Sequence, residues 1–391
     1  MSGRMIYLDN NATTPIAPEV REAMLPYLTD LYGNPSSMYS FAGQVAEGLK
    51  EARAKVAALL GAAAEEITFT SCGTESDSTA ILSAVRRFPD KRHIITTRVE
   101  HPAVKNLCEN ISLFTGHKYR VTQLKVDEQG MLDLAEYEAA LSDDTAIVSV
   151  MWANNETGVI FPIAEMARMA KNRGILFHTD AVQAVGKIPI NLAALDVDFL
   201  SLSGHKLHAP KGVGVLYVKK GTLFTPFLFG GHQERGRRGG TENVAGIVAL
   251  GKASELAAAH MATENNRVRA LRDRLEEGLL TRIPKSILNG HKTNRLPNTC
   301  NISFEYVEGE SILLHMNRQG ICASSGSACT SGSLEPSHVL RAMGVPFTAA
   351  HGSIRFSLSV YNTEAEIDFV LETLPPIIAG LRKLSPFWKE D

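Results

Sequence analysis

A lysine stands shortly after an apolar β-rich run, where an unpaired positive charge is costly. The run is Phe199–Ser203, and Gly204-His205-Lys206 follows it directly. A Schiff base would neutralise Lys206, whereas a strand-end lysine that reaches solvent is the ordinary alternative. Lys206 alone favours the ordinary reading, so its neighbours in the fold must decide.

An aspartate ends another β-rich run in the same part of the chain. Asp180 follows Ile175–His178, and a carboxylate there could keep a pyridine nitrogen protonated, which makes such a ring an electron sink. Asp180 could equally accept N–H groups of the next turn as a helix cap. Asp180 and Lys206 together are more specific for a Schiff-base cofactor than either residue alone.

The segment Phe69–Glu75 predicts a strand, a glycine-containing turn and the start of a helix. Free N–H groups and the positive end of a helix suit a phosphate, and the Thr74 hydroxyl adds a donor. We therefore expect Thr74 and Glu75 in a cofactor site. A well-capped helix without a ligand is the alternative, because a single glycine makes a weak motif.

Two further polar side chains follow β-rich runs. His101 comes after His93–Thr97, and Asn155 comes after Ala146–Trp152. The imidazole could stack on a cofactor ring or carry protons, and the amide could hydrogen-bond a ring oxygen. A satisfied core histidine and an ordinary asparagine turn are the alternatives. The joint occurrence of these groups at separate strand ends outweighs the individual alternatives.

Cys329 lies in a small, polar, glycine-containing segment, residues 323–333, which predicts a mobile loop with an accessible thiol. The chain has 5 cysteines, an odd number, so we expect at least one free thiol. The other four are interpreted as small buried apolar residues: Cys72, Cys108, Cys300 and Cys322. Close Cys spacing is absent, and His205 and His208 have no paired cysteines, so we expect no metal in the free protein.

Arg355 is a charged residue inside the apolar β-rich run Ser353–Ser359. Its planar fork could bind a carboxylate through two parallel hydrogen bonds. An edge-strand arginine that faces water is the ordinary alternative. We take Arg355 as the candidate for binding a substrate carboxylate.

The elements that must position these residues form an alternation of short β-rich runs and helical stretches, which predicts an α/β fold with a mainly parallel sheet. Ligands bind at the carboxyl ends of the strands in such sheets. Helical spacing begins at Pro18, and an apolar stripe from Val45 to Leu60 ends at Gly61. The β-rich runs are Ile67–Thr70, His93–Thr97, Ala146–Trp152, Ile175–His178, Phe199–Ser203 and Val213–Val218. Helices are expected from Thr74 and over Ile163–Arg173.

Beyond Gly251 the pattern changes to longer helical stretches followed by fewer β-rich runs, which predicts a second, smaller α+β domain. We expect residues 16–255 to form the large cofactor-binding domain. Residues 1–15 and 256–391 are expected to form the small domain that carries the Cys329 segment. Its elements are expected at Ala253–Thr263, Val268–Ile283, Thr299–Phe304 and Ser353–Ser359.

The composition is that of a nearly neutral globular chain. Of 391 residues, 44% are hydrophobic and 21% are charged, and the formal net charge is −2. No Lys/Arg block of five or more occurs, so nucleic acid and anionic lipid are not expected as partners. Neither a run of 18 apolar residues nor a signal-peptide core occurs, so we expect a cytoplasmic protein with no membrane contact.

Together, these motifs resemble the fold-type-I pyridoxal-phosphate enzymes and, more narrowly, the cysteine desulfurases with a long Ser-Ser-Gly-Ser-Ala-Cys loop. The similarity runs from Tyr7 to Trp388, nearly the whole chain. The segment Ser331–Arg341 looks more like the nitrogen-fixation (NifS) branch than the housekeeping branch. The chain departs from the family pattern at Tyr39, where histidine is more common, and at Ser78, where asparagine is usual.

The resemblance implies pyridoxal 5′-phosphate as cofactor and a role for each candidate residue. Lys206 would form the Schiff base, Asp180 would contact the pyridine nitrogen, and His101 would stack on the ring. The other implied contacts are Asn155 and Gln183 to the ring oxygen, Thr74, Ser203 and His205 to the phosphate, Thr241 to the phosphate of the neighbouring subunit in a homodimer, and Asn34 with Arg355 to the substrate carboxylate.

The activity that the resemblance implies is removal of sulfur from L-cysteine, which leaves L-alanine and a persulfide on the nucleophile Cys329. Lys206 and His101 are the implied proton carriers, and an iron–sulfur scaffold protein is the implied acceptor. Selenocysteine lyase, an aminotransferase and a housekeeping desulfurase stay open as alternative activities. A non-catalytic scaffold subunit is the alternative from another class, and the joint presence of Lys206, Asp180 and Cys329 speaks against it.

Overall fold

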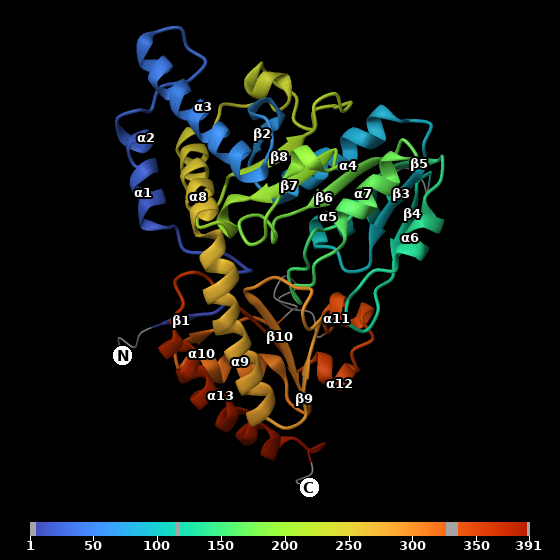
Figure 1. The fold of residues 1–391 in the computed structure, drawn as a ribbon, viewed down its shortest axis with the longest axis vertical. Helices are drawn as coiled ribbons and strands as arrows, with labels where there is room; N and C mark the ends of the chain where they lie inside the picture. Colours follow the sequence, from blue (N-terminus) through green and yellow to red (C-terminus); the bar gives the residue numbers. More distant parts are fainter. Residues whose placement is uncertain (1–4, 115–117, 326–334, 389–391) are drawn as a thin grey trace.

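The structure is a computed structural model that describes residues 5–114, 118–325 and 335–388 (Figure 1). The part drawn from blue to yellow is built around a seven-stranded sheet, and the orange and red part is built around a three-stranded sheet. The described chain begins and ends beside the smaller sheet. Within the described residues, no helix is both long and apolar enough to cross a membrane.

The large sheet is mainly parallel, so the predicted α/β fold is confirmed. Its strands, in spatial order, are β2 (Ile67–Thr70), β8 (Gly214–Val218), β7 (Phe199–Ser203), β6 (Leu176–Asp180), β5 (Thr145–Ser149), β3 (His93–Thr97) and β4 (Arg120–Leu124). Strand β8 runs antiparallel to β2 and β7, and the other neighbouring strands are parallel. The parallel arrangement brings the ends of β3, β5, β6 and β7 to one edge of the sheet.

Helices cover both faces of the large sheet. They are α1 (Pro18–Met24), α2 (Pro26–Thr29), α3 (Ser40–Leu60), α4 (Gly73–Arg87), α5 (Pro102–Phe114), α6 (Leu134–Ala140), α7 (Ile163–Lys171) and α8 (Val244–Thr263). Successive strand residues point to opposite faces. Ile94 and Ile147 pack with residues of α4 and α5, whereas Ile95 and Val148 pack with residues of α3, α7 and α8.

The predicted stripe from Val45 to Leu60 is the buried face of α3. This helix ends at Gly61, whose φ of 59° lies in the left-handed region that glycine adopts without strain. The predicted run Ala146–Trp152 is shorter in the structure, because β5 ends at Ser149 and the Met151 N–H donates to the Glu100 carboxylate, 3.0 Å away.

The small sheet is antiparallel and has the order β12 (Ser353–Ser357), β10 (Thr299–Phe304) and β9 (Ser286–Leu288). Helices α9 (Arg269–Arg282), α10 (Gly309–Arg318) and α13 (Glu364–Leu384) contribute buried apolar residues to the same core. The short strand β1 (Ile6–Tyr7) pairs in parallel with β11 (Ile321–Cys322). The short helices α11 (His338–Ala342) and α12 (Phe347–Ala350) complete this part.

A continuous helical path joins the two parts. Helix α8 begins at Val244 and passes through a π-helical turn, Glu264–Val268, into α9. The predicted boundary at residue 255 therefore lies inside α8, and Val339 and Leu340 of α11 pack with the core of the large sheet. The division into residues 16–255 and residues 1–15 with 256–391 stays a prediction.

Candidate active site

A cavity of about 590 Å³ opens at the carboxyl ends of the parallel strands. The candidate residues that line it are Thr74, His101, Asn155, Asp180, Gln183, Ser203, His205, Lys206 and Arg355. Each of the first eight follows or ends a strand of the large sheet, and Arg355 reaches the cavity from β12 of the small sheet. Cys329 lies outside the described residues.

Lys206 stands on a short 3-10 turn that follows β7, and backbone carbonyls hold its amine. Its Nζ donates to the oxygens of Asn11 at 2.5 Å and Ala12 at 2.7 Å. These carbonyls come from the segment near the N-terminus that runs between the two sheets, so the amine is directed into the cavity rather than to open solvent. The arrangement is suited to a Schiff-base lysine and does not match the ordinary strand-end alternative.

Asp180 and His101 bring a carboxylate and an imidazole to the same cavity. Asp180 is 6% exposed, and its Oδ1 accepts the Val182 N–H at 2.9 Å. Burial raises the pKa of Asp180, and the nearby His101 and Lys206 oppose that rise. Burial lowers the pKa of His101, whose Nδ1 accepts the Ala103 N–H at 3.1 Å. The neutral imidazole therefore carries its proton on Nε2.

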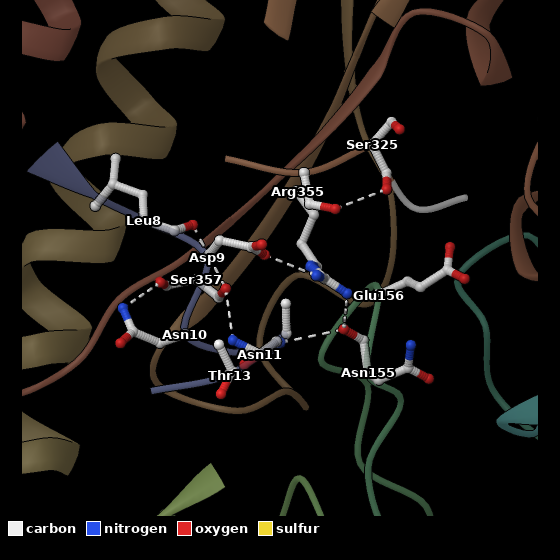
Figure 2. A network of polar contacts seen from close by, with 12 residues as sticks. Leu8, Asp9, Asn10, Asn11, Thr13, Asn155, Glu156, Ser325, Arg355 and Ser357 are labelled. Carbon is white, nitrogen blue, oxygen red and sulfur yellow. Dashed lines mark hydrogen bonds and ion pairs between the residues drawn. The ribbon is translucent and has the colours of Figure 1, made fainter. Parts of the chain in front are cut away.

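Arg355 of β12 is buried, and its fork lies between Asp9 and Asn155 (Figure 2). Its Nη2 lies 2.8 Å from Oδ1 of Asp9, and its Nη1 donates to the Asn155 carbonyl at 3.1 Å. The Nε atom is buried without a hydrogen-bond partner in the described structure. The water-facing alternative for Arg355 is therefore wrong, because the fork is buried and bonded to Asp9 and Asn155.

The other end of the cavity is formed by the start of α4 and the turn after β7. Thr74, Ser203 and His205 line it, and the pKa of His205 is lowered to about 4 by burial and by nearby lysines. Cys72 is the N-cap of α4, with the Glu75 N–H donating to its Sγ at 3.4 Å. The interpretation of Cys72 as a small buried apolar residue was wrong, because the thiol is half-buried on the cavity wall and works as a cap.

Three of the expected site residues do not line this cavity. The Glu75 carboxylate pairs with Arg238 at 2.9 Å and accepts the Ser71 N–H at 2.8 Å, so it holds the turn together. Asn34 is exposed, and its side-chain oxygen accepts the Ser36 N–H. Thr241 is also exposed.

Sequence reasoning missed several residues of the site. Asn11 supplies a carbonyl to Lys206, and Asp77 lines the cavity as a buried carboxyl beside His178, 3.5 Å away. Gly73 and Asp77 are four positions apart, so they share a face of α4, which is a signal that could have found Asp77. Burial and the neighbouring Asp180 raise the pKa of Asp77 well above its usual range.

The other described cysteines differ in burial. Cys108 and Cys300 are buried, as interpreted, whereas Cys322 is half-buried. All four cysteines of the described residues are free thiols. No cluster of metal-ligating side chains occurs within residues 5–114, 118–325 and 335–388.

The arrangement of the cavity has counterparts in known proteins. The aminotransferase class-V family model matches residues 6–370. The chain belongs to the class-V aminotransferase family. Within this family it is 62% identical to cysteine desulfurase 2 of Trichormus variabilis, over 98% of this chain and 95% of that protein. It is 61% identical to the cysteine desulfurase NifS of Azotobacter vinelandii, over 98% and 95% of the two chains.

Solved structures give the same class-V fold. A NifS-like protein superposes with a TM-score of 0.90 at 38% identity, covering 97% of this chain and all 100% of the other. SspA in complex with cysteine superposes with a TM-score of 0.79 at 33% identity, over 92% of this chain and 100% of that one. The predicted fold class and the predicted family are therefore confirmed.

Class-V cysteine desulfurases use pyridoxal 5′-phosphate, and the cavity fits that cofactor. A Cβ built on Gly73 would lie 2.9 Å from a methyl carbon of Val182, so a larger residue would force the cavity wall to shift at the start of α4, where free N–H groups suit a phosphate. The buried Asp180 gains from a cationic partner, which a protonated ring nitrogen provides. Lys206 would supply the amine for the aldehyde, so the residues present offer a donor or a charge for each end of the cofactor.

Proposed function

We propose that this protein is an L-cysteine desulfurase that releases L-alanine and carries the sulfur as a persulfide on Cys329. One observation carries the proposal: Lys206, Asp180 and His101, from separate strand ends, face one cavity together with the buried fork of Arg355. The high identity to proteins named cysteine desulfurase supports the same activity. A binding-only subunit would not need this combination of charges.

The residues that would hold the cofactor divide into three groups in this proposal. Asp180 would face the ring nitrogen, with His101 beside the ring. Asn155 and Gln183 would bind the ring oxygen, and Thr74, Ser203 and His205 would bind the phosphate. The bound cofactor would supply an aldehyde that condenses with amines, and an electron-withdrawing ring that stabilises negative charge at the α-carbon of the amino acid.

The chain's own residues would then carry out the reaction. Arg355 binds the substrate carboxylate through its fork, and the substrate replaces Asp9 as the partner of one of its nitrogens. The Lys206 amine takes the α-proton as general base, and Lys206 and His101 return protons to the product. The Cys329 thiolate attacks the substrate sulfur, so that an S–S bond forms while the C–S bond breaks and its electron pair stays with the alanine carbon.

The position of the chain on either side of Cys329 supports this role. Before the segment 326–334, Ser324 pairs with Arg355, since the backbone N–H of Arg355 donates to the Ser324 carbonyl at 2.7 Å. After it, Glu335, Ser337 and His338 line the cavity. The described chain therefore leads into and out of the Cys329 segment at the active site.

We also propose a homodimer in which Thr241 reaches the phosphate site of the neighbouring subunit. The chain just before Thr241 carries exposed apolar side chains, among them Leu228 and Phe229, which is 75% exposed. The Gly239 N–H donates to the Leu228 carbonyl, so this apolar segment lies beside the residues that immediately precede Thr241. A contiguous apolar segment of this kind is typical of a buried subunit contact.

We infer that the sulfur passes to an iron–sulfur scaffold protein in the cytoplasm, and that nitrogenase assembly is the specific use. The similarity to NifS of Azotobacter vinelandii supports this branch. The free thiols among the described cysteines agree with a reducing compartment.

The test is turnover of L-cysteine by purified protein loaded with pyridoxal 5′-phosphate, in the presence of a thiol reductant. Wild type should show a visible cofactor band and release alanine and sulfide in equal amounts without a keto acid. Lys206→Ala should lose the visible band and the release of products. The matched control Lys211→Ala changes an exposed lysine nearby in the chain and should keep the band and the release of products. Alanine that forms only with an added keto acid would show an aminotransferase, and a protein that binds no cofactor would refute the proposal.

A further inference from the structure

A second buried lysine stands close to the active site, and the reaction proposed above does not use it. Lys187 is 6% exposed, lies after β6 and does not line the cofactor cavity. It lines a separate cavity of about 60 Å³ at the junction of the two sheets, together with Glu264 of the π-helical turn. Burying a lysine is costly, so its hydrogen bonds need an explanation.

Both hydrogen bonds of Lys187 go to one residue. Its Nζ donates to the backbone oxygen of Gln183 and to the side-chain oxygen Oε1, each at 3.2 Å. Among the described residues, no carboxylate lies within the 4.0 Å of an ion pair with this amine, Glu264 included. Lys187 is therefore bound to Gln183 more closely than to any acid.

These bonds determine which way the Gln183 amide points. An ammonium group donates and does not accept, so the atom that faces Lys187 must be the amide oxygen. The amide nitrogen Nε2 is then on the other side, where it donates to the Asn11 carbonyl at 3.0 Å. The same carbonyl accepts from Lys206 Nζ at 2.5 Å. The amide nitrogen and the Lys206 amine thus converge on one acceptor.

We propose that Lys187 is a positioning residue that fixes the Gln183 amide with its N–H groups toward Lys206 and the cofactor cavity. The inference rests on the proposed function, because it gives Gln183 its ring-oxygen role. In pyridoxal the ring oxygen is on the carbon next to the one that bears the aldehyde. A donor near Lys206 stabilises this oxygen in its ionised form, whereas a flipped amide would present another oxygen to it.

The charge of Lys187 depends on its surroundings. Burial lowers the pKa of Lys187 to about 8, Glu264 opposes that fall, and Arg355 adds to it. The other titratable groups that line the same cavity are Lys206, His208, His260 and Tyr361. At neutral pH the amine keeps its proton, which the donor role requires.

The experiment is a pH titration of the visible band of the bound cofactor in wild type, Lys187→Met, Gln183→Ala and the double variant. Loss of one hydrogen bond to a charged oxygen is expected to raise the pH midpoint of the band by about one unit in Lys187→Met. Gln183→Ala should raise it at least as much. In the double variant, Lys187→Met should add nothing further, because Lys187 acts through Gln183.

The outcomes separate this inference from the proposed function. A Lys187→Met midpoint equal to that of wild type, or a shift of equal size in the Gln183→Ala background, would overturn the positioning role while wild-type desulfuration stands. If Lys187→Met does not fold, Lys187→Arg keeps the charge and the donors and should keep the wild-type midpoint. A Lys187→Arg midpoint like that of Gln183→Ala would overturn the inference as well. Absence of any cofactor band in wild type would instead refute the proposed function.

Discussion

Arg355 offers the sharpest test at the scale of single residues, because its fork is buried, pairs with Asp9, and has an Nε atom without a partner among the described residues. Arg355→Lys keeps the charge and removes the planar fork. We expect kcat/KM for L-cysteine to fall about 10- to 100-fold, chiefly through KM, because hydrogen bonds to charged groups contribute about 1.5–3 kcal/mol. The cofactor band should be unchanged, as measured by absorbance beside steady-state kinetics.

The matched control is Arg382→Lys, another buried arginine, whose guanidinium donates to the carbonyls of Pro284, Lys285 and Glu305 far from the cavity. This change should lower stability and leave kcat/KM as it is. An unchanged KM in Arg355→Lys, or an equal rise in the Arg382→Lys control, would contradict the assignment of Arg355.

At the same scale, the sequence predicted the residues that follow strands and missed those that the packing brings in. Lys206, Asp180 and His101 could be found because each follows a recognisable β-rich run, and parallel strands end at one edge. Asn11 could not be assigned, because its contribution is a backbone carbonyl from a segment far away in the chain. Cys72 was misread because nothing in the sequence shows that it caps α4.

At the scale of elements, the start of α4 is the feature that the phosphate site depends on. A Cβ on Gly73 would come within 2.9 Å of Val182, so Gly73→Ala must shift the cavity wall. We expect the dissociation constant for pyridoxal 5′-phosphate to rise about tenfold, which corresponds to about 1.4 kcal/mol. Cofactor binding to the apoprotein, followed by absorbance, gives this constant.

Gly43→Ala in α3 is the comparison, because a Cβ there meets no atom within 4 Å. It should leave cofactor binding unchanged and stabilise the helix by about 0.5–1 kcal/mol. If Gly73→Ala binds the cofactor as tightly as wild type does, the phosphate is not held at the start of α4.

Element prediction succeeded where both faces of a strand are buried, including the edge strand β2, and failed at the more exposed edge strand β4. β7 and β10 match their predicted bounds, and all their residues are buried, with apolar residues recurring between small polar ones. β4 was missed, because Arg120–Leu124 is an edge strand with exposed and half-buried side chains. The predicted helices Ala253–Thr263 and Val268–Ile283 leave a break between them, and at this break the structure has the π-helical turn that joins α8 to α9.

At the scale of the whole molecule, buried carboxyl groups near the sheet edge make stability depend on pH. Burial raises the pKa of Glu100 from 4.5 to about 8, although hydrogen bonds from Met151 and Thr97 oppose the rise. Between these values the folded chain holds a proton that the unfolded chain releases. The stability that this bound proton contributes is complete below pH 4.5 and is lost as the pH rises through about 8. The free energy of unfolding therefore falls between pH 4.5 and about 8.

We expect Glu100→Gln, which keeps the shape without the charge, to reduce the pH slope of apoprotein stability by up to about 1.4 kcal/mol per pH unit. Chemical unfolding from pH 5 to pH 8 measures it. Glu138→Gln, an exposed glutamate on α6, should leave the slope as it is. Equal slopes in wild type and Glu100→Gln would mean that Glu100 is ionised in the folded protein.

The arrangement of the two sheets was the least predictable feature of the whole molecule. The change of pattern after Gly251 indicated a second unit, yet the boundary falls inside α8 and α11 packs with the large core. Arg355 reaches the cavity only because β12 pairs with β10 and the N-terminal segment crosses between the sheets. Contacts of this range depend on the final packing of the chain and leave no local trace in the sequence.

The most direct measurement compares wild type with Cys329→Ala and Cys322→Ala, incubated with L-cysteine and a thiol reductant while the cofactor spectrum, alanine and sulfide are recorded. Cys322 is the control because it is a half-buried free thiol on β11, outside the cavity lining. The account predicts that Cys329→Ala binds the cofactor and releases neither product, whereas Cys322→Ala matches wild type. Wild-type alanine and sulfide from Cys329→Ala would contradict the persulfide role of Cys329.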